Sequence, residues 1–113
     1  MESQLELNSE RIRLLEKFKQ ALPDLVLAES STWGVVYQDG ALSHKIKRLI
    51  ALGIALRAGC KNCILGHTLR AIELGASKEE ILETISVNVT MSGTTGIGEG
   101  LRVLKLLEEV EKL

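Results

Sequence analysis

The chain has 113 residues, of which 45% are hydrophobic and only 3% aromatic, and its formal net charge is −1. This length accommodates one domain with a core and is too short for two domains of ordinary size. The near-zero charge and the three aromatic residues supply neither the attraction nor the stacking surface that nucleic acids require, so no nucleic-acid partner is expected.

The longest apolar run, Leu49–Leu56, is much shorter than the roughly 20 residues of a membrane-spanning helix. The start Met1–Gln4 also lacks the basic and apolar regions of a signal peptide. We therefore expect a cytoplasmic protein with no membrane segment. Because a small domain cannot hide so large an apolar fraction internally, part of it is expected to be buried between subunits.

The first forty residues are expected to form two helices. Ser9 can cap a first helix from Glu10 to Ala21, in which apolar side chains recur every three or four residues as in a buried stripe. The stripe consists of Ile12, Leu15, Phe18 and Leu22. Pro23 is a favourable first position for a second helix, which closes at Asp39-Gly40.

Two further helices follow in the middle of the chain. Ser43 can cap a helix from His44 to Arg57, whose apolar positions are spread too widely for one exposed face, so this helix is expected to be central to the core. A fourth helix is expected from Cys60 to Leu74. It stops at Gly75, where a left-handed residue is favoured.

The last part of the chain predicts two more helices separated by glycines. Ser77 and Glu80 form a capping box that opens a helix reaching Met91. The run Ser92–Gly100 lacks a preceding strand and the Gly-Lys-[Ser/Thr] ending of a phosphate loop. It is therefore expected to be a loop and helix start whose glycines permit close helix approach. A final helix is expected from Leu101 onward.

Together these elements predict an all-α fold in a single domain, residues 1–113. Residues 1–40 contain the N-terminal helices, and residues 41–113 form the core with the sequence CxxCxxxH. No repeat, linker or low-complexity segment divides the chain.

Both cysteines and one histidine lie within eight positions, in the stretch AGCKNCILGH. On a helix, Cys60 faces Cys63, and Cys63 faces His67 one turn further on. A C-x-x-C pair can close a disulfide, and a helix N-terminus favours thiolate. An imidazole four residues after Cys63 can take its proton directly or through one water. The pattern favours a redox-active dithiol assisted by a histidine.

The same three side chains are also compatible with a structural role or with a metal site. Buried cysteines and a satisfied polar histidine are common in ordinary helices. A zinc site would have to combine two of the three side chains with further ligands such as His44, because seven helical residues separate Cys60 from His67 by ~10.5 Å. Covalent haem attachment is excluded, because Ile64 follows the second cysteine where a histidine is needed. No metal and no cofactor is expected.

Two more groups of side chains fit ordinary structural roles. Trp33 and Tyr37, four residues apart, can line a substrate pocket but are more typical of a core or a subunit interface. Glu79, Glu80 and Glu83 fit the acidic first turn of a capped helix better than a pair of catalytic carboxylates.

The segment from Ala41 to about Gly93 resembles the carboxymuconolactone decarboxylase family, specifically its cysteine-bearing branch typified by the alkyl hydroperoxidase AhpD. The matching stretches are LSHKIKRLIALGIALRAGC-KNC-ILGH, AIELGASKEEILETISV and the glycine-rich MSGTTG. The combination of C-x-x-C-x-x-x-H with G-A-[ST]-x-E-E-I-x-E makes the resemblance specific. It covers nearly half of the chain strongly and the flanking helices loosely.

The resemblance implies an AhpD-like helical bundle with the CxxC motif at the start of a central helix. It implies that Cys63 is the peroxide-attacking thiol, Cys60 the thiol that resolves it as a disulfide, and His67 the proton-relay histidine. It further implies a hydroperoxide substrate, a dithiol or lipoyl-type reductant, and a trimer or hexamer whose active sites lie close to subunit contacts.

One position departs from the family pattern. The family usually has a Glu twelve residues before the first cysteine, where it completes the relay to the histidine, and this chain has Arg48. A cation there would stabilise a Cys63 thiolate and lower the pKa of a nearby imidazole, whereas a carboxylate would raise that pKa. One resolution is another acid-base partner, for which Glu99, Glu83 and His44 are the candidates. The other is electrostatic activation of the thiol by Arg48 and the helix end. An exposed, solvated Arg48 is the simplest alternative.

Two functions are therefore expected from the sequence. The first is a thiol-dependent oxidoreductase of peroxidase type, which reduces hydroperoxides through a dithiol-disulfide cycle of Cys60 and Cys63 assisted by His67. The second is a catalytically weak, helical, oligomeric binding or scaffold protein of the same fold, because the relay Glu is replaced by Arg48.

Overall fold

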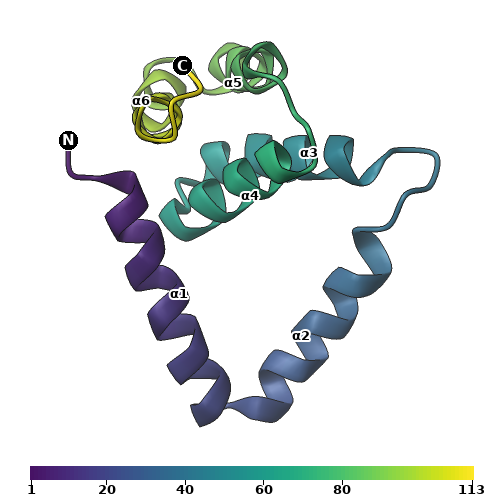
Figure 1. Cartoon of the computed structure of the whole chain (residues 1–113). Coiled ribbons are helices and arrows are strands. Elements are labelled where there is room, and N and C mark those ends of the chain that lie inside the picture. Colours follow the sequence, from purple (N-terminus) through teal and green to yellow (C-terminus); the bar gives the residue numbers. More distant parts are fainter.

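The computed structural model describes all 113 residues, with six α-helices and no β-strand (Figure 1). The helices are α1 (Gln4–Ala21), α2 (Pro23–Val36), α3 (His44–Ala58), α4 (Lys61–Glu73), α5 (Lys78–Ser92) and α6 (Thr94–Glu109). The all-α prediction is confirmed. No helix has both the length and the apolar character needed to cross a membrane.

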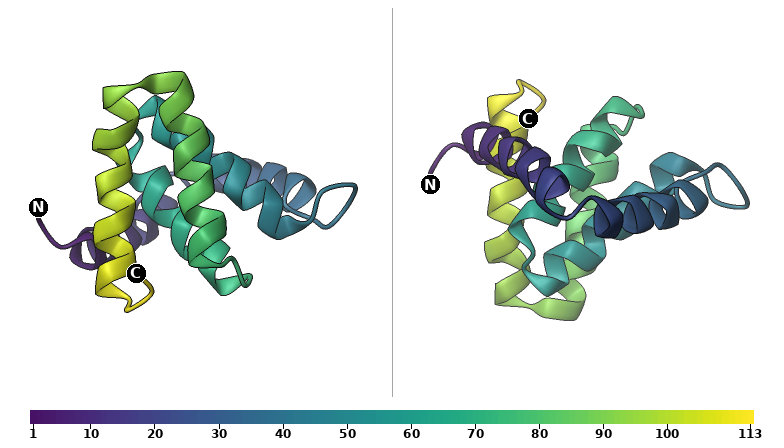
Figure 2. Two further views of the ribbon diagram at one scale, coloured as in Figure 1. Left: turned by 90° about the horizontal axis from the view of Figure 1, so that it is seen from above. Right: turned by 90° about the horizontal axis from the view of Figure 1, so that it is seen from below.

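Four of the helices form the body of the molecule. Helices α3 and α4 lie side by side, and α5 and α6 form an antiparallel pair that covers them (Figures 1 and 2). Helices α1 and α2 form a V that extends away from this body, with its tip at Pro23 (Figure 1). The start of α1 contacts the body, whereas α2 buries none of its residues.

The hydrophobic core lies between α3, α4, α5 and α6. Its most completely buried side chains are Leu52, Leu56, Ile64, Leu65, Ile81, Val103, Leu106 and Leu107. Helix α3 contributes Leu52 and Leu56 to this core and leaves Ile50 and Ile54 exposed on its opposite side. The wide apolar spread that predicted a central helix therefore divides into a core face and an outer face.

The turn between α3 and α4 positions the cysteines. The Ser43 hydroxyl accepts the Ile46 N–H at 3.2 Å, so the predicted cap of α3 is confirmed. Gly59 ends α3 with a φ of 69°, a left-handed conformation that glycine adopts without the clash a Cβ would cause. The chain turns there, and Cys60 becomes the N-cap of α4.

Two other predicted helix boundaries are confirmed. Gly75 follows α4 with a φ of 90°. The capping box of α5 is complete, because the Ser77 hydroxyl accepts the Glu80 N–H at 3.0 Å and the Glu80 carboxylate accepts the Ser77 N–H at 2.9 Å. These boundaries depend on residues a few positions apart, which is why the sequence alone predicts them.

The predicted start of α1 at Ser9 is wrong. The helix begins at Gln4, because the Ser3 hydroxyl caps it and the Glu109 carboxylate at the end of α6 accepts hydrogen bonds from the Ser3 hydroxyl and, at 2.7 Å, from the Gln4 N–H. Ser9 lies inside the helix, where its hydroxyl donates to the Leu5 carbonyl. Ser3 and Glu6 have the same S-x-x-E spacing as Ser77 and Glu80, so Ser3 and Ser9 are competing local caps, and the sequence alone does not show that Glu109 supports Ser3.

The predicted loop before the last helix is also corrected. Helix α6 begins at Thr94, so several glycines lie inside it. A Cβ at Gly100 would lie 2.9 Å from Ile85 Cγ2, and a Cβ at Gly96 would lie 3.1 Å from Val89 Cα. The glycines thus permit the close approach of α5 and α6, as expected, but from within a helix.

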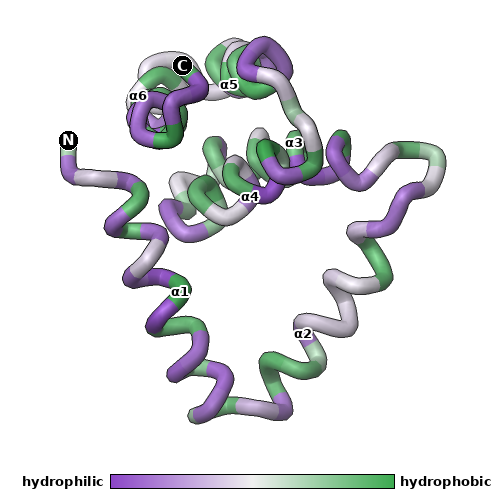
Figure 3. The backbone as a smooth tube through the Cα atoms, viewed as in Figure 1, coloured by the Kyte–Doolittle hydropathy of each residue, from purple (hydrophilic) through white to green (hydrophobic).

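The stripe predicted to be buried on α1 is exposed in the single chain. Ile12 is 55% exposed and Phe18 47% exposed. On α2, Leu27 is 68% exposed and Trp33 52%. Figure 3 shows hydrophobic segments along both arms of the V. The periodicity correctly indicates an apolar face, but it does not indicate what covers that face.

Candidate functional site

The two cysteines form a disulfide at the start of α4. Cys60 is the N-cap residue, and its Sγ accepts the Cys63 N–H at 3.3 Å. Their Cα atoms are 5.3 Å apart, within the range that a disulfide bridges. The predicted dithiol is therefore placed to cycle between two thiols and a disulfide.

The two sulfur-bearing residues differ in their surroundings. Cys63 is exposed, whereas Cys60 is partly covered. The N–H bond donated to Cys60 Sγ favours negative charge on that sulfur when the disulfide opens. Cys63 is thus the sulfur that an outside molecule reaches, and Cys60 is the better leaving thiolate.

His67 lies one helical turn after Cys63, and Arg48 lies within hydrogen-bond reach of it. The Arg48 Nη1 atom is 3.2 Å from His67 Nδ1. No carboxylate forms an ion pair with His67. The residue at the family's Glu position therefore contacts the histidine, and the alternative of a merely solvated Arg48 is wrong.

Arg48 connects two imidazoles and a phenol ring. Its Nε donates to His44 Nε2 at 3.0 Å, and its Cζ lies 3.9 Å from the centre of the Tyr37 ring. The Tyr37 ring centre is 5.9 Å from each imidazole centre. A cation over an aromatic face is attracted by the ring's negative face. Helices α3 and α4 and the residue after α2 thus converge on one guanidinium.

These contacts fix the protons on both neutral histidines. A guanidinium has five N–H donors and no acceptor, so each ring nitrogen facing Arg48 must accept. His67 accepts at Nδ1 and carries its proton on Nε2, and His44 accepts at Nε2 and carries its proton on Nδ1. Neutral His67 therefore presents an N–H donor at Nε2, and in this form it cannot act as a base through that nitrogen.

The surroundings keep both histidines neutral. Burial lowers the pKa of His67 below its ordinary value, and the charges of Arg48 and Arg11 lower this pKa further. Desolvation also lowers the pKa of His44, with Arg48 as the next cause. The expectation that a cation at position 48 lowers the pKa of the neighbouring imidazole is confirmed.

The structure does not bring the two candidate acids to His67. Glu83 is exposed on α5. Glu99 on α6 lies near the end of α3, with Oε1 3.9 Å from where a Cβ on Gly59 would be. Of the three candidate partners, only His44 joins the cluster, and it does so through Arg48.

Sequence reasoning misses two members of the cluster. It favours a core or an interface over a substrate pocket for Tyr37, and it gives Arg11 no role. Tyr37 reaches the site because the chain turns between α2 and α3, and Arg11 reaches it because α1 crosses α4. No sequence pattern connects either residue to the cysteines. No three His, Cys, Asp or Glu side chains converge as metal ligands do.

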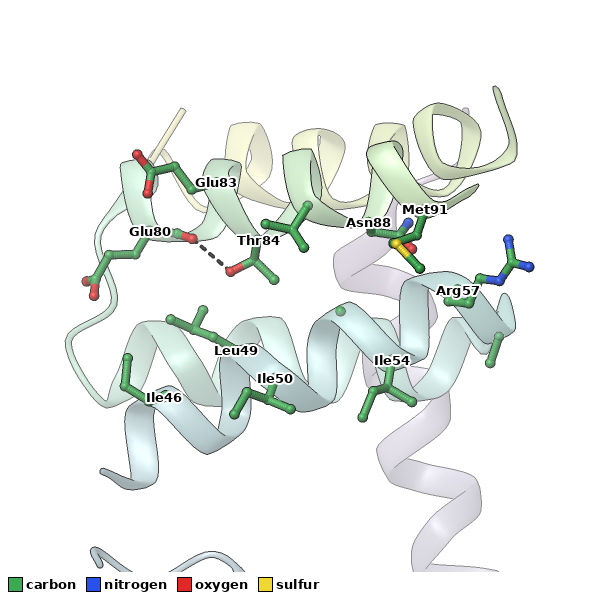
Figure 4. A pocket seen from close by; sticks show the side chains of 13 residues that line it. Ile46, Leu49, Ile50, Ile54, Arg57, Glu80, Glu83, Thr84, Asn88 and Met91 are labelled. Atoms are coloured by element: carbon green, nitrogen blue, oxygen red, sulfur yellow. Dashed lines mark hydrogen bonds between the residues drawn. The ribbon is translucent and has the colours of Figure 1, made fainter. Parts of the chain in front are cut away.

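A concave surface separate from this cluster lies between α3 and α5. It is an open, mostly apolar groove of about 830 Å³. Figure 4 shows Ile50, Ile54 and Met91 on its walls, with Glu80 and Glu83 at one end and Arg57 at the other. The cysteines, His67 and Arg48 do not line this groove.

Comparison with known sequences gives relatives over most of the chain. The profile of the carboxymuconolactone decarboxylase family matches residues 27–106. A protein of Paracoccus denitrificans known as uncharacterized protein 4 in the cox locus is 35% identical over 91 residues, covering 80% of this chain and 79% of its own. An uncharacterized protein of Cupriavidus necator is 35% identical over 77 residues, covering 68% of each chain.

Solved structures show the same arrangement of helices. A carboxymuconolactone decarboxylase family protein from Legionella pneumophila superposes with a TM-score of 0.88 at 32% identity, covering 94% of this chain and 95% of its own. A Thermotoga maritima protein of the family, for which a part in the antioxidative response is suggested, superposes with a TM-score of 0.74 at 29% identity. That match covers 91% of this chain and 87% of the other.

The resemblance seen in the sequence is thus confirmed by the family profile and by the fold. The bonded Cys60–Cys63 pair is consistent with the cysteine-bearing, AhpD-like branch. The chain belongs to the carboxymuconolactone decarboxylase family.

Proposed function

We propose that this protein is a thiol-dependent peroxidase that reduces hydroperoxides through the Cys60–Cys63 pair. The observation that carries the proposal is the disulfide at the N-terminus of α4, with Cys63 exposed and with His67, which Arg48 contacts, one turn further along the same helix. An exposed thiol at a helix N-terminus near a guanidinium has the electropositive setting of reactive cysteines.

In the oxidising half of the cycle, the Cys63 thiolate attacks the terminal oxygen of the hydroperoxide. The O–O bond breaks, Cys63 becomes a sulfenic acid, and the alkoxide takes a proton and leaves as an alcohol. The Cys60 thiol then attacks the Cys63 sulfur, which forms the disulfide and releases water. Two electrons pass from the cysteine pair to the peroxide.

In the reducing half, a dithiol donor, either free or lipoyl-type, attacks the exposed Cys63 sulfur. Cys60 leaves as a thiolate, which the Cys63 N–H stabilises. The donor's second thiol closes on the mixed disulfide, which releases Cys63 and leaves the donor oxidised. The cycle suits a reducing compartment such as the cytoplasm, where such donors are regenerated.

Arg48 changes the part that His67 plays. Because Arg48 donates to Nδ1, neutral His67 offers its Nε2–H as a hydrogen-bond donor to the sulfur or to the leaving oxygen. Positive charge from Arg48 and the helix end favours the thiolate. In this arrangement the thiol is activated electrostatically and no carboxylate relay is needed.

Peroxide consumption by the reduced protein with dihydrolipoamide tests the proposal. We expect the protein to consume hydroperoxide catalytically and to return to the Cys60–Cys63 disulfide, as seen by intact mass, when the donor is exhausted. The control is the same protein with both thiols alkylated beforehand. Consumption no faster than that of the control would contradict the proposal.

A binding or scaffold role is the second candidate, and the absence of a carboxylate at His67 favours it. In that case the fold and the disulfide persist without efficient turnover. The pH dependence of thiol alkylation separates the two roles. A Cys63 pKa at or above the unperturbed value of ~8.5 would support the binding role, and a clearly lower pKa would support the enzyme.

We also propose that the chain works as a trimer or hexamer. The support is the exposed apolar side chains of α2, which include Leu27 and Trp33 and which a subunit contact would remove from water. Light scattering is expected to give a mass of three or six chains. Trp33→Ser should lower that mass, and a parent protein that is monomeric at about 10 µM would contradict the proposal.

A further inference from the structure

Two partly buried guanidinium groups lie close enough to His67 for their charges to lower its pKa. Arg48 and Arg11 both lower the pKa of His67, and neither forms an ion pair with a carboxylate. Partial burial also lowers the pKa of each arginine. A cation that loses water without gaining an anion is costly. Arg48 is engaged with His44, His67 and Tyr37, so Arg11 is the cation suited to receiving an anion.

The nearby carboxylates are already bound to other groups. Glu10 pairs with Arg13 at 2.5 Å, and Glu73 pairs with Arg70 at 2.7 Å. Asp39 accepts the backbone N–H of His44 at 2.7 Å. The charge of Glu73 still raises the pKa of Arg48, whereas no carboxylate has this effect on Arg11.

The contacts of Arg11 leave the end of its guanidinium free. Its Nε donates to Asn8 Oδ1 at 2.9 Å, and its terminal nitrogens make no other hydrogen bond. The guanidinium packs over Gly66, where a Cβ would lie 3.4 Å from Nη1. Because the residue before His67 has no side chain, α1 can bring this charge against α4.

A groove of about 350 Å³ runs along α1, and Arg11 is one of the residues that line it. Its apolar wall consists of Leu7, Leu14, Leu15, Phe18 and Leu65. Lys61 and Asn62, the two residues between the cysteines, lie at its other side and add a second positive charge. The one acid that lines it, Glu10, is paired with Arg13. The groove thus combines apolar walls with the cations of Arg11 and Lys61, and it borders the two residues between the cysteines.

We infer that this groove, with the guanidinium of Arg11 and the ammonium of Lys61, forms a carboxylate subsite that selects amphiphilic hydroperoxides of the fatty-acid type. The apolar chain lies along α1, and the carboxylate is bound by Arg11, with Lys61 adding positive charge. A planar guanidinium matches a carboxylate with two parallel hydrogen bonds, and apolar walls bury the chain. The selection of a hydroperoxide substrate rests on the proposed peroxidase function, whereas the binding of a carboxylate in this groove does not depend on that function.

Binding is tested with octanoate and its uncharged counterpart octanamide on the oxidised, full-length protein, by calorimetric titration. We expect octanoate to bind about tenfold or more tightly, since charge-assisted hydrogen bonds are the strong class and tenfold corresponds to one such contact. Arg11→Gln should remove most of this preference, and Arg11→Lys should restore part of it. Lys17→Gln removes an exposed charge from the same helix and should leave the preference unchanged.

Several results would overturn the inference. These are equal binding of octanoate and octanamide, equal losses in Arg11→Gln and Lys17→Gln, or octanoate binding that does not weaken with added salt. The salt titration uses the parent protein, so a variant that fails to fold does not remove the test. No octanoate binding at all, as expected if a second copy of the chain fills the groove, would also overturn it.

Turnover provides a separate test of selection. The parent protein should show a kcat/KM about tenfold or more higher for a fatty-acid hydroperoxide than for its methyl ester, and Arg11→Gln should reduce this ratio towards one. Octanoate binding without any peroxide turnover would contradict the proposed function while supporting the subsite. Turnover with equal rates for acid and ester would support the function and overturn the subsite.

Discussion

Cys63→Ser is expected to lower hydroperoxide turnover by about a thousandfold or more, to the level of the donor alone. A serine hydroxyl at this position has no base that can take its proton, because His67 accepts from Arg48 at Nδ1 and carries a proton on Nε2. Loss of a nucleophile typically removes nearly all of the catalytic rate. The measurement is steady-state consumption of hydroperoxide at fixed dihydrolipoamide.

Cys60→Ser is the matched control, because it removes the other sulfur of the same disulfide. Cys63 can still attack one peroxide in this variant, so we expect a single oxidation to a sulfenic acid that dimedone traps, followed by little turnover. The different exposure of the two residues is the structural reason for this asymmetry. If Cys63→Ser keeps the parent rate, or if dimedone labels Cys60 in Cys63→Ser instead, the assigned roles are wrong.

The parts of the fold that the sequence predicts are those that depend on neighbouring residues. The cap at Ser43, the left-handed Gly75 and the capping box from Ser77 to Glu80 each involve residues a few positions apart, and all three are confirmed. The start of α1 is predicted wrongly although Ser3 and Glu6 also have capping-box spacing, because Ser9 offers a second local cap and the contact that supports Ser3 comes from Glu109 at the opposite end of the chain. Local chemistry specifies helices, whereas distant contacts set where some of them begin.

The same distinction between local contacts and contacts of distant residues applies to the site. The spacing of Cys60, Cys63 and His67 is a local property of one helix, and in the structure the two cysteines pair at the start of α4 with His67 one turn further on in the same helix. The contact between Arg48 and His67 joins two helices. The sequence therefore shows that Arg48 replaces the family's Glu, but it does not show which side chain contacts His67. Tyr37 and Arg11 come from further elements and carry no signal at all.

Arg48→Gln is expected to raise the pKa of His67 towards its ordinary value, because the nearest positive charge is removed while the burial remains. It should also lower the rate of Cys63 oxidation at pH 7 by roughly ten- to a hundredfold. The lost hydrogen bond between a charged group and His67 is worth ~1.5–3 kcal/mol, and 1.4 kcal/mol corresponds to tenfold. The fixed proton position on His67 is lost with it.

The same substitution changes how stability depends on pH. In the parent, folding lowers the pKa of His67 and His44, so the unfolded chain binds more protons below the unfolded value of ~6.5. The free energy of unfolding should therefore fall as the pH drops from 7 through that value, and Arg48→Gln should reduce this fall. Urea unfolding of the oxidised protein at several pH values measures the pH dependence of the free energy of unfolding, and NMR of the imidazole protons measures the pKa of His67.

Arg57→Gln, which removes an exposed arginine from the same helix, is the control. An unchanged pKa of His67 in Arg48→Gln, or an equal rise in Arg57→Gln, would show that Arg48 does not keep this histidine neutral.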